Sequence, residues 1–407
     1  MSGIPASAFS PAARLGRIQP SPSTAAAARV RELKAEGRRI LDLTVGEPDF
    51  DTPEHVKEAA IAAIRAGETK YTPVNGTPAL REAIRGSLRR THGIEYSDAE
   101  ITVGGGGKQV IFLALMATVD AGDEVLVPAP YWVSYPDMVR ANEGEPVIVA
   151  TSAENRYKLT PEALEAAIGP RTTWLILNSP GNPSGAVYSE DELAALAAVL
   201  RRHPRVSVLS DEIYSEISFT GAPAPSLAAV APDLRHRVLV VSGVSKSYAM
   251  TGWRLGYAAG DPALVKAINT LQSQTSSCPS SISQAAAAAA LSGPQDFIAR
   301  TVPVYAERRD AAVAGFSAID GLEPLIPDGA FYLSVDCAGL IGRRTDDGRT
   351  LADDQDVTLY LLDRAGVAVI QGSAYGRSPF FRISFATDLG TLTAAVDAVA
   401  EAVAALR

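Results

Sequence analysis

The sequence predicts an α/β protein with a largely parallel sheet covered by helices on both faces. Short apolar runs alternate with helical segments between about residues 100 and 241, and this alternation is typical of parallel sheets. Several runs end in glycine-rich or polar loops, where open α/β sheets bind ligands. A chain of 407 residues is too long for one simple core. We therefore expect two domains, or one large α/β domain with a smaller partner.

The N-terminal part is expected to start irregularly and then form helices. Residues 1–27 are rich in Pro, Ser and Ala, which favours irregular structure. The first helical pattern ends at Gly37, because glycine commonly terminates helices. We predict helices over residues 25–36, 53–65 and 78–91 and a short strand over 40–43.

The middle of the chain carries the strand–helix alternation. Ser189 and Glu192 have capping-box spacing, which marks the start of one helix. The predicted strands are 101–103, 124–127, 146–150, 172–177, 206–209 and 238–241, and the predicted helices are 108–119, 131–141, 160–168 and 189–202.

The C-terminal part is expected to be mixed. A proline, Pro279, should interrupt a long helical stretch over residues 261–292. Further helices are predicted over 294–316, 354–365 and 389–406, with strands over 330–335, 367–370 and 381–385.

Composition excludes several classes of function. The net charge of −9 argues against non-specific nucleic-acid binding, which needs a basic face. Two distant cysteines, Cys278 and Cys337, and four scattered histidines suggest neither disulfides nor a metal site. No apolar run has membrane-spanning length, and the first ten residues lack the features of a signal peptide. We expect a cytoplasmic protein without a metal, a nucleic-acid partner or a membrane anchor.

The segment around Lys246 is the main candidate for chemistry. It follows the apolar run 238–241, and small residues surround the lysine, with Arg254 eight positions later. Small neighbours let a planar group approach the backbone closely. A lysine in such surroundings can lose its proton and attack carbonyl groups. The alternative is a surface loop with incidental charges.

A glycine cluster, residues 104–107, joins a predicted strand to a predicted helix. Free backbone N–H groups at a helix start suit a phosphate group. Gln109 excludes both the Walker A motif and the GxGxxG motif. The cluster therefore predicts a phosphate site of another kind, or else only a tight turn.

Two loops that follow buried strands carry further polar candidates. The loop 178–185 is rich in Pro and Gly and contains Asn182, and the next predicted strand ends at Asp211 and Glu212. A buried acid is costly unless it is paired, and the protonated ring nitrogen of a cofactor would pair with Asp211. Glu212 is expected to be structural.

Trp132 and Arg382 complete the set. Trp132 starts a predicted helix and could stack on a planar cofactor or belong to the core. Arg382 lies in an apolar strand and needs an anionic partner. That partner is either a ligand carboxylate, which a guanidinium binds in a two-pronged way, or an internal acid.

These motifs together resemble those of the class I/II pyridoxal-phosphate (PLP) dependent aminotransferases of fold type I. The likeness is greatest to the bacterial aspartate aminotransferase subgroup, through GEPDFDTP, YTPVNG, PYWVSYP and SKSYAMTGWRLGY. The resemblance implies a mostly parallel seven-stranded sheet between helices in a large domain, with a smaller α/β domain formed from both termini. It suggests an N-terminal arm over 1–27, a small domain over 28–48 and 302–407, and a large PLP-binding domain over 49–301.

The resemblance also implies roles for the cofactor-binding residues. Lys246 would bind PLP as a Schiff base and act as general base and acid, and Asp211 would pair with the pyridine nitrogen. Asn182 and Tyr214 would contact the phenolic oxygen of PLP, and Trp132 would stack on the ring. The phosphate would lie against Arg254, and Gly106, Gly107, Lys108 and Ser245 would also bind the cofactor.

For the substrate, the resemblance implies that Arg382 binds the α-carboxylate, with Gly46, Trp132 and Asn182 nearby. Tyr71 would reach the PLP phosphate of a neighbouring subunit, so a homodimer with shared active sites is expected. The partners would be an L-amino acid and a 2-oxo acid, with aspartate and 2-oxoglutarate as the expected pair in a ping-pong cycle.

Departures from the family pattern leave substrate choice open. Leu113 and Gln371 stand where relatives often carry Asn and Pro, and Tyr135 stands where animal enzymes carry His. No arginine in 270–299 resembles the animal enzymes' distal-carboxylate arginine, so Lys108 or residues 21–23 would meet that carboxylate. The alternatives are an aromatic amino acid or prephenate aminotransferase, a β-eliminating PLP lyase and, more remotely, a non-catalytic regulator with this fold.

Overall fold

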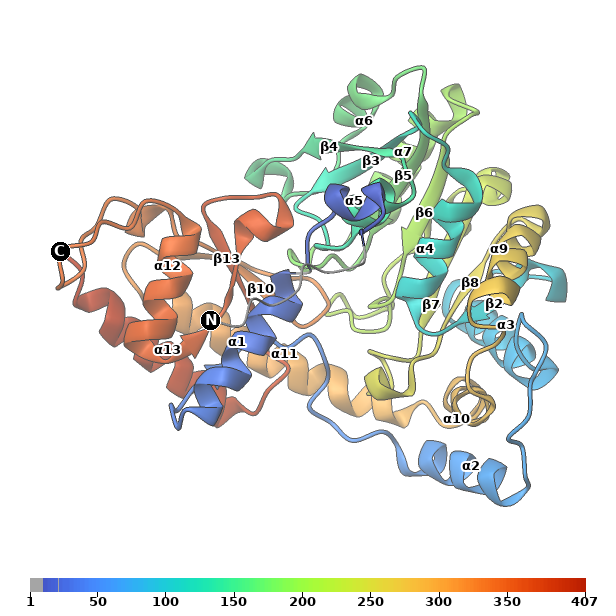
Figure 1. Cartoon of the computed structure of the whole chain (residues 1–407), viewed down its shortest axis with the longest axis horizontal. Helices are drawn as coiled ribbons and strands as arrows, with labels where there is room; N and C mark the ends of the chain where they lie inside the picture. The colour runs from blue at the N-terminus through green and yellow to red at the C-terminus, as the bar shows by residue number, and fades with distance from the viewer. Residues whose placement is uncertain (1–9, 21) are drawn as a thin grey trace.

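The computed structural model describes residues 10–20 and 22–407. Two lobes lie side by side, one built on a large sheet and the other formed mainly by the C-terminal part of the chain (Figure 1). The large sheet has seven strands in the order β2-β8-β7-β6-β5-β3-β4. All its neighbouring strands are parallel except the pairs that β8 makes with β2 and β7. The predicted seven-stranded, mostly parallel sheet is therefore confirmed.

The strands of this sheet follow the apolar runs of the sequence. They are β2 (Ile101–Gly104), β3 (Glu124–Ala129), β4 (Glu145–Ala150), β5 (Thr172–Asn178), β6 (Ser207–Asp211), β7 (Val238–Gly243) and β8 (Gly256–Ala259). The associated helices are α2 (Glu54–Arg65), α3 (Pro78–His92), α4 (Gly107–Thr118), α5 (Tyr135–Ala141), α6 (Pro161–Ala167), α7 (Glu190–Arg202), α8 (Leu227–Val230), α9 (Pro262–Thr275) and α10 (Ser281–Ser292).

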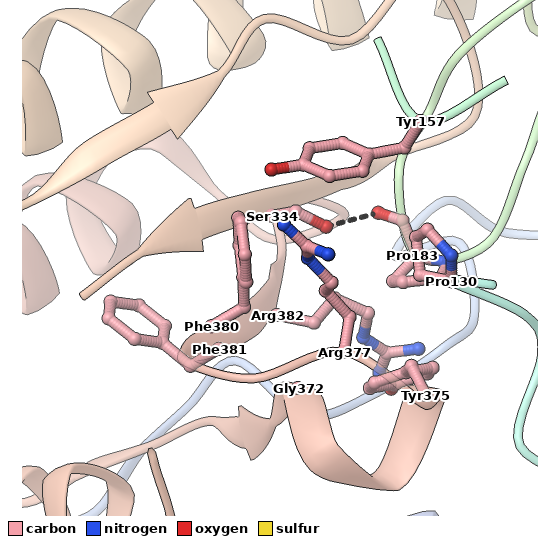
Figure 2. Close-up of a pocket in the computed structure, with 10 residues that line it drawn as sticks. All are labelled: Pro130, Tyr157, Pro183, Ser334, Gly372, Tyr375, Arg377, Phe380, Phe381 and Arg382. Carbon is pink, nitrogen blue, oxygen red and sulfur yellow. Dashed lines mark hydrogen bonds between the residues drawn. The ribbon is translucent and has the colours of Figure 1, made fainter. Parts of the chain in front are cut away.

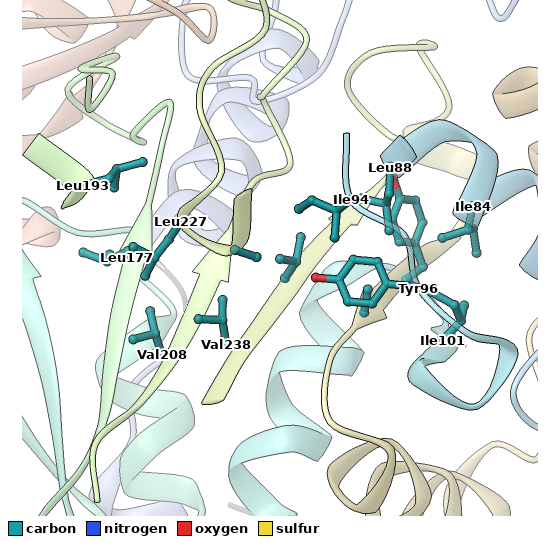
Figure 3. Close-up of a cluster of buried hydrophobic side chains, with 14 of the residues drawn as sticks. Ile84, Leu88, Ile94, Tyr96, Ile101, Leu177, Leu193, Val208, Leu227 and Val238 are labelled. Atoms are coloured by element: carbon teal, nitrogen blue, oxygen red, sulfur yellow. The ribbon is translucent and has the colours of Figure 1, made fainter. Parts of the chain in front are cut away.

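Alternate residues of the central strands enter two separate hydrophobic clusters. Val208 of β6 and Val238 of β7 belong to the cluster in Figure 3, together with residues of α3, α7 and α10. Leu209 and Leu239 belong to the cluster that includes residues of α4, α5 and α9. Because successive strand residues point to opposite faces, helices cover both sides of this sheet.

The second lobe joins the two ends of the chain. Strand β1 (Leu41–Asp42) pairs in parallel with β11 (Val367–Ala368). An antiparallel sheet of order β12-β13-β10-β9 lies beside it. Its strands are β9 (Glu323–Leu325), β10 (Tyr332–Asp336), β12 (Ile370–Gln371) and β13 (Phe380–Ser384), and the helices of this lobe are α1 (Pro22–Ala35), α11 (Asp296–Ser317), α12 (Asp354–Tyr360) and α13 (Leu389–Ala404).

Several predicted boundaries are wrong. Helix α1 begins at Pro22 rather than residue 25, since proline suits the first turn of a helix. Helix α5 begins at Tyr135 rather than residue 131, because residues 131–134 form a loop that is tied to Tyr375 by the N–H of Tyr131. Strands β8 and β9 were not predicted at all. In the described part of the chain, no helix is both long and apolar enough to cross a membrane.

Candidate active site

A cavity of about 540 Å³ opens at the carboxyl ends of β5, β6 and β7, between the two lobes. All but two of the predicted site residues line it, and they come from segments far apart in the sequence. They are Gly46, Gly107, Lys108, Trp132, Asn182, Asp211, Tyr214, Ser245, Lys246, Arg254 and Arg382. Gly106 directly precedes the lining residue Gly107 and lies close to Arg254, whereas Tyr71 does not line the cavity.

Lys246 follows β7 and projects into the cavity. Its Nζ donates a hydrogen bond to the carbonyl oxygen of Gly46 at 2.5 Å. Burial lowers the pKa of this amine to about 8, although the charge of Glu47 opposes the shift. A larger fraction of Lys246 is therefore neutral near neutral pH than of an ordinary lysine, which favours nucleophilic and general-base chemistry.

Asp211 ends β6 and is only 6% exposed. Its Oδ2 accepts a hydrogen bond from the hydroxyl of Tyr135 at 2.6 Å, and its Oδ1 accepts one from the N–H of Ile213 at 3.3 Å. Burial raises the pKa of the carboxyl to about 6, while both hydrogen bonds lower it. Asp211 forms no ion pair with any described residue. A ligand that brings a cationic N–H would thus stabilise its ionised form.

The glycine cluster and Arg254 form a close-fitting cradle. A Cβ at Gly106, which has φ +99°, would lie 2.5 Å from a guanidinium nitrogen of Arg254. A Cβ at Gly256 would lie 2.2 Å from the backbone nitrogen of Gly107, the first residue of α4. Arg254 donates hydrogen bonds to the carbonyls of Thr251 and Gly105 at 2.9 and 3.3 Å. A helix start beside an arginine whose partners in residues 10–20 and 22–407 are all neutral fits a phosphate group.

Arg382 is 3% exposed and has only neutral partners among the described residues. It donates to Oδ1 of Asn182 at 3.1 Å and to the carbonyl of Thr44 at 2.6 Å. Its buried Nε has no hydrogen-bond partner there, and its guanidinium carbon lies 4.3 Å from the ring centroid of Tyr332. A buried cation without a counter-ion fits the carboxylate of a ligand. The sequence left open an internal acid as the partner of Arg382, but no described acidic residue pairs with it.

The loop beside Arg382 is held by a second contact. Figure 2 shows the hydroxyl of Ser334 pointing to the carbonyl of Pro183, to which it donates a hydrogen bond at 3.0 Å. The small pocket around this contact, about 10 Å³, is lined by Arg382 and Arg377 among others. Ser334 thus ties β10 to the residue that follows Asn182.

Aromatic side chains form the remaining walls. The hydroxyls of Tyr214 and Tyr332 lie 2.8 Å apart, and Tyr214 is 4% exposed. Trp132 packs edge-to-face on Tyr135, and Nζ of Lys108 lies 4.7 Å from its ring centroid. These rings line the same cavity as Asp211 and Lys246, and an aromatic face there suits stacking on a pyridine ring.

Tyr71 does not join the cavity of its own chain. Its side chain is 88% exposed, which is unusual for a large aromatic residue. The predicted place of Tyr71 in a shared site involves a second subunit, so it stays a prediction.

Sequence reasoning missed several cavity residues. Asn178 donates from Nδ2 to the carbonyl of Asp211 at 3.0 Å and accepts from the N–H of Asn182 at 2.8 Å. Its position at the end of β5 was a usable signal. The sequence carried no signal for Tyr332 or Arg31, because only the packing of the second lobe brings them to the cavity. The departure Leu113 is buried in the core, and Gln371 pairs with Phe381 in the small sheet.

Comparisons with known proteins identify one family. A family model described as "Aminotransferase class I and II" matches residues 38–399. The chain is 51% identical over 394 residues to an aspartate aminotransferase of Rhizobium meliloti (strain 1021), covering 97% of this chain and 96% of that protein. It is 50% identical over 373 residues to an aspartate/prephenate aminotransferase of Cereibacter sphaeroides, covering 92% of this chain and 93% of that protein.

Solved structures lead to the same family. The crystal structure of the aspartate aminotransferase from Rhizobium meliloti superposes with a TM-score of 0.96 at 50% identity, covering 98% of this chain and 100% of that chain. The structure of the Thermus thermophilus aspartate aminotransferase with maleate superposes with a TM-score of 0.90 at 39% identity, covering 97% of this chain and 100% of that chain. The chain belongs to the class I and II aminotransferases, a family of enzymes that use PLP.

Proposed function

We propose that the protein transfers the amino group of L-aspartate to 2-oxoglutarate in a ping-pong cycle. The observation that carries this proposal is the meeting of Lys246, Asp211 and Arg382 in one cavity. They offer a nucleophilic amine, a partner for a ring nitrogen and a carboxylate-binding cation. Relatives about half identical over nearly their whole length, named as aspartate aminotransferases, support the choice of substrate.

The residues present fit PLP. Lys246 would hold the cofactor, Asp211 would face its ring nitrogen, and Trp132 would stack on its ring. Asn182 and Tyr214 would meet the phenolic oxygen. The phosphate would lie against Arg254 and against Gly106, Gly107 and Lys108 at the start of α4. Ser245, which follows β7, would also contact the cofactor. When bound, PLP supplies an electron-withdrawing ring that makes the Cα–H bond of an amino acid more acidic.

The chain's own residues would orient the substrate and move the proton. Arg382 would bind the α-carboxylate by two parallel hydrogen bonds, with Asn182 and the backbone near Gly46 beside it. This position would place the substrate Cα near Nζ of Lys246. The neutral amine would take the Cα proton as a general base and return it as a general acid. Burial, which lowers the pKa of Lys246 to about 8, supports this role.

The second carboxylate of aspartate would lie at the other end of the cavity. Lys108 lines that cavity and is a candidate for it. The other predicted group, residues 21–23, includes Ser21, which lies outside the described residues.

A second function, transamination of prephenate or aromatic amino acids, is favoured by one observation. Several relatives at about 50% identity are named as aspartate/prephenate aminotransferases. Such a protein would accept both kinds of substrate. β-Elimination and a regulatory role remain the alternatives that no specific observation favours.

A spectral test with a panel of amino acids separates these functions. The purified protein with PLP should show the absorption band of lysine-bound cofactor, and aspartate should convert this band within one half-reaction. Conversion of the band by phenylalanine, or amination of prephenate by the protein after its half-reaction with aspartate, would add the second function. Release of ammonia and pyruvate would indicate elimination. No spectral change with any amino acid would overturn the proposal.

Three further features belong to the same proposal. The protein would act as a homodimer in which Tyr71 reaches the phosphate of the partner's cofactor, and its exposure in the single chain supports this. The proposed division is an arm over 1–27, a small domain over 28–48 and 302–407, and a large domain over 49–301. It is supported by one hydrophobic cluster within the large domain and a second made mostly of residues of the small domain. A cytoplasmic location stays a prediction.

A further inference from the structure

The helix α1 presents one face to the active-site cavity. Thr24, Ala27 and Arg31 line the cavity, and their spacing of three and four residues places them on one side of a helix. Another side carries Val30 and Leu33, which are 2% and 1% exposed and pack with Ile40 and Ala368. The buried side fixes the rotation of α1 and therefore directs Arg31 to the cavity.

Arg31 is a cation without a protein counter-ion in the described part of the chain. It forms no ion pair or hydrogen bond with a described residue, whereas Arg29, two positions earlier, pairs with Glu32 at 3.2 Å. The other arginines of the cavity are engaged: Arg254 by the carbonyls of Thr251 and Gly105, and Arg382 by Asn182 and Thr44.

The charges around the cavity favour a ligand with more than one negative group. Its cationic side chains are Arg31, Lys108, Lys246, Arg254 and Arg382, and its acidic ones are Glu47 and Asp211. Glu47 accepts a hydrogen bond from the hydroxyl of Thr251 at 2.8 Å, and Asp211 accepts one from Tyr135. After a phosphate and one carboxylate are bound, Arg31 remains for a further anion.

We propose that Arg31 determines specificity by binding the second carboxylate of dicarboxylic substrates. This inference rests on the proposed aminotransferase function and deepens it. The planar guanidinium binds a carboxylate in a two-pronged way, and the small side chain of Ala27, one turn earlier, leaves room for the substrate. Arg382 and Arg31 would then hold the two ends of the same molecule, with the reacting carbon between them.

The test compares Arg31→Gln with Arg29→Gln, a matched control on the same helix at a residue that does not line the cavity. With PLP bound, kcat/KM is measured for aspartate, glutamate and phenylalanine. Dissociation constants for succinate, a non-reacting dicarboxylate, are measured from the cofactor spectrum. In Arg31→Gln, kcat/KM for aspartate and for glutamate should fall about 10-fold or more, because a charge-assisted hydrogen bond is lost. The dissociation constant for succinate should rise about 10-fold or more for the same reason. The kcat/KM for phenylalanine should be unchanged. Arg31→Lys should recover part of the loss for the dicarboxylates.

Two results would overturn the role of Arg31. Unchanged succinate affinity in Arg31→Gln would exclude contact with the second carboxylate. An equal loss for phenylalanine and aspartate would indicate a general structural effect. The proposed function is tested separately, because it depends on aspartate turnover by the unsubstituted protein, whatever the variant does.

Discussion

At the scale of single residues, the buried amine of Lys246 has a consequence that can be measured without turnover. Its pKa is lowered to about 8, chiefly by burial. Only the neutral amine attacks an aldehyde. The rate at which the cofactor-free protein captures PLP should therefore rise with pH up to about 8 and level off above it. An ordinary lysine would keep rising to about 10.4.

Stopped-flow absorbance over a pH series measures this rate. Lys246→Ala should show no lysine-bound absorption at any pH, although it should still bind PLP non-covalently through the remaining contacts. A capture rate that keeps increasing well beyond pH 9 would contradict the lowered pKa. Fully retained absorption in Lys246→Ala would show that another lysine is the attachment point.

Asp211 and Tyr135 form a second pair whose titration can be predicted. Below a pH of about 6 the carboxyl is neutral, since burial raises its pKa to that value. It then no longer stabilises a protonated ring nitrogen, so PLP affinity should weaken as pH falls through about 6. The Tyr135 hydroxyl donates to the carboxylate and lowers this pKa.

Removing that hydroxyl in Tyr135→Phe should therefore move the weakening to higher pH. Equilibrium titration of PLP at each pH measures the shift. Tyr131→Phe, a change in the same segment at a residue that does not contact Asp211 in the described structure, is the control and should leave the profile unchanged. A Tyr135→Phe profile that coincides with the unsubstituted one would disprove the coupling.

How well residues could be predicted depended on whether their signal was local. Asp211 and Asn182 follow apolar runs, and a polar group at that point has few structural reasons to be there. Arg382 stood out as a charge inside an apolar strand. Arg31 looked like any charged residue of a surface helix, because its place at the cavity is fixed by contacts to residues such as Ala368 that are distant in sequence.

At the scale of elements, the contact between β8 and the start of α4 controls the phosphate cradle. In Gly256→Ala the new Cβ would lie 2.2 Å from the nitrogen of Gly107 and 2.6 Å from the carbonyl carbon of Gly106. These are backbone atoms, so no side-chain rotation relieves the overlap, and the helix start must move. We expect a loss of about 1–3 kcal/mol in the free energy of unfolding.

PLP affinity should fall in the same variant, because the backbone N–H groups at the helix start would be displaced. Thermal unfolding with and without PLP measures both effects, and the stabilisation gained from PLP should shrink. Gly252→Ala is a suitable control, since a Cβ there meets no atom within 4 Å. Similar stability and PLP affinity in the two variants would refute the close packing of this joint.

Elements whose periodicity agreed with their environment were predicted best. The strands β5, β6 and β7 each contain an unbroken apolar run, over 174–177, 208–209 and 238–241, because both of their faces are covered. The start of α5 was misplaced, because the preceding residues are drawn into a loop that contacts Tyr375. Strand β8 was missed, since four residues starting with a glycine give no clear period.

At the scale of the whole molecule, the site exists only because the two lobes meet. Lys246 of the large-sheet lobe contacts the carbonyl of Gly46, and Asn182 contacts Arg382 of the small sheet. A bidentate ion pair between Arg308 of α11 and Asp49, with N···O distances of 2.7 and 2.8 Å, fixes the segment that carries Gly46. The alternating pattern predicted the large sheet, but the pairing of β1 with β11 across more than three hundred residues had no local signal.

The expected dimer can be tested through Tyr71. If this residue completes the site of the partner subunit, Tyr71→Ala and Lys246→Ala should each be weak or inactive alone. A hybrid dimer of the two variants has one site with an intact Lys246 and an intact Tyr71 from the other chain. Mixing the variants under conditions that allow subunit exchange should therefore restore activity, up to one site in each hybrid dimer. If Tyr71 acted within its own chain, every hybrid site would lack one of the two groups, and mixing would restore nothing.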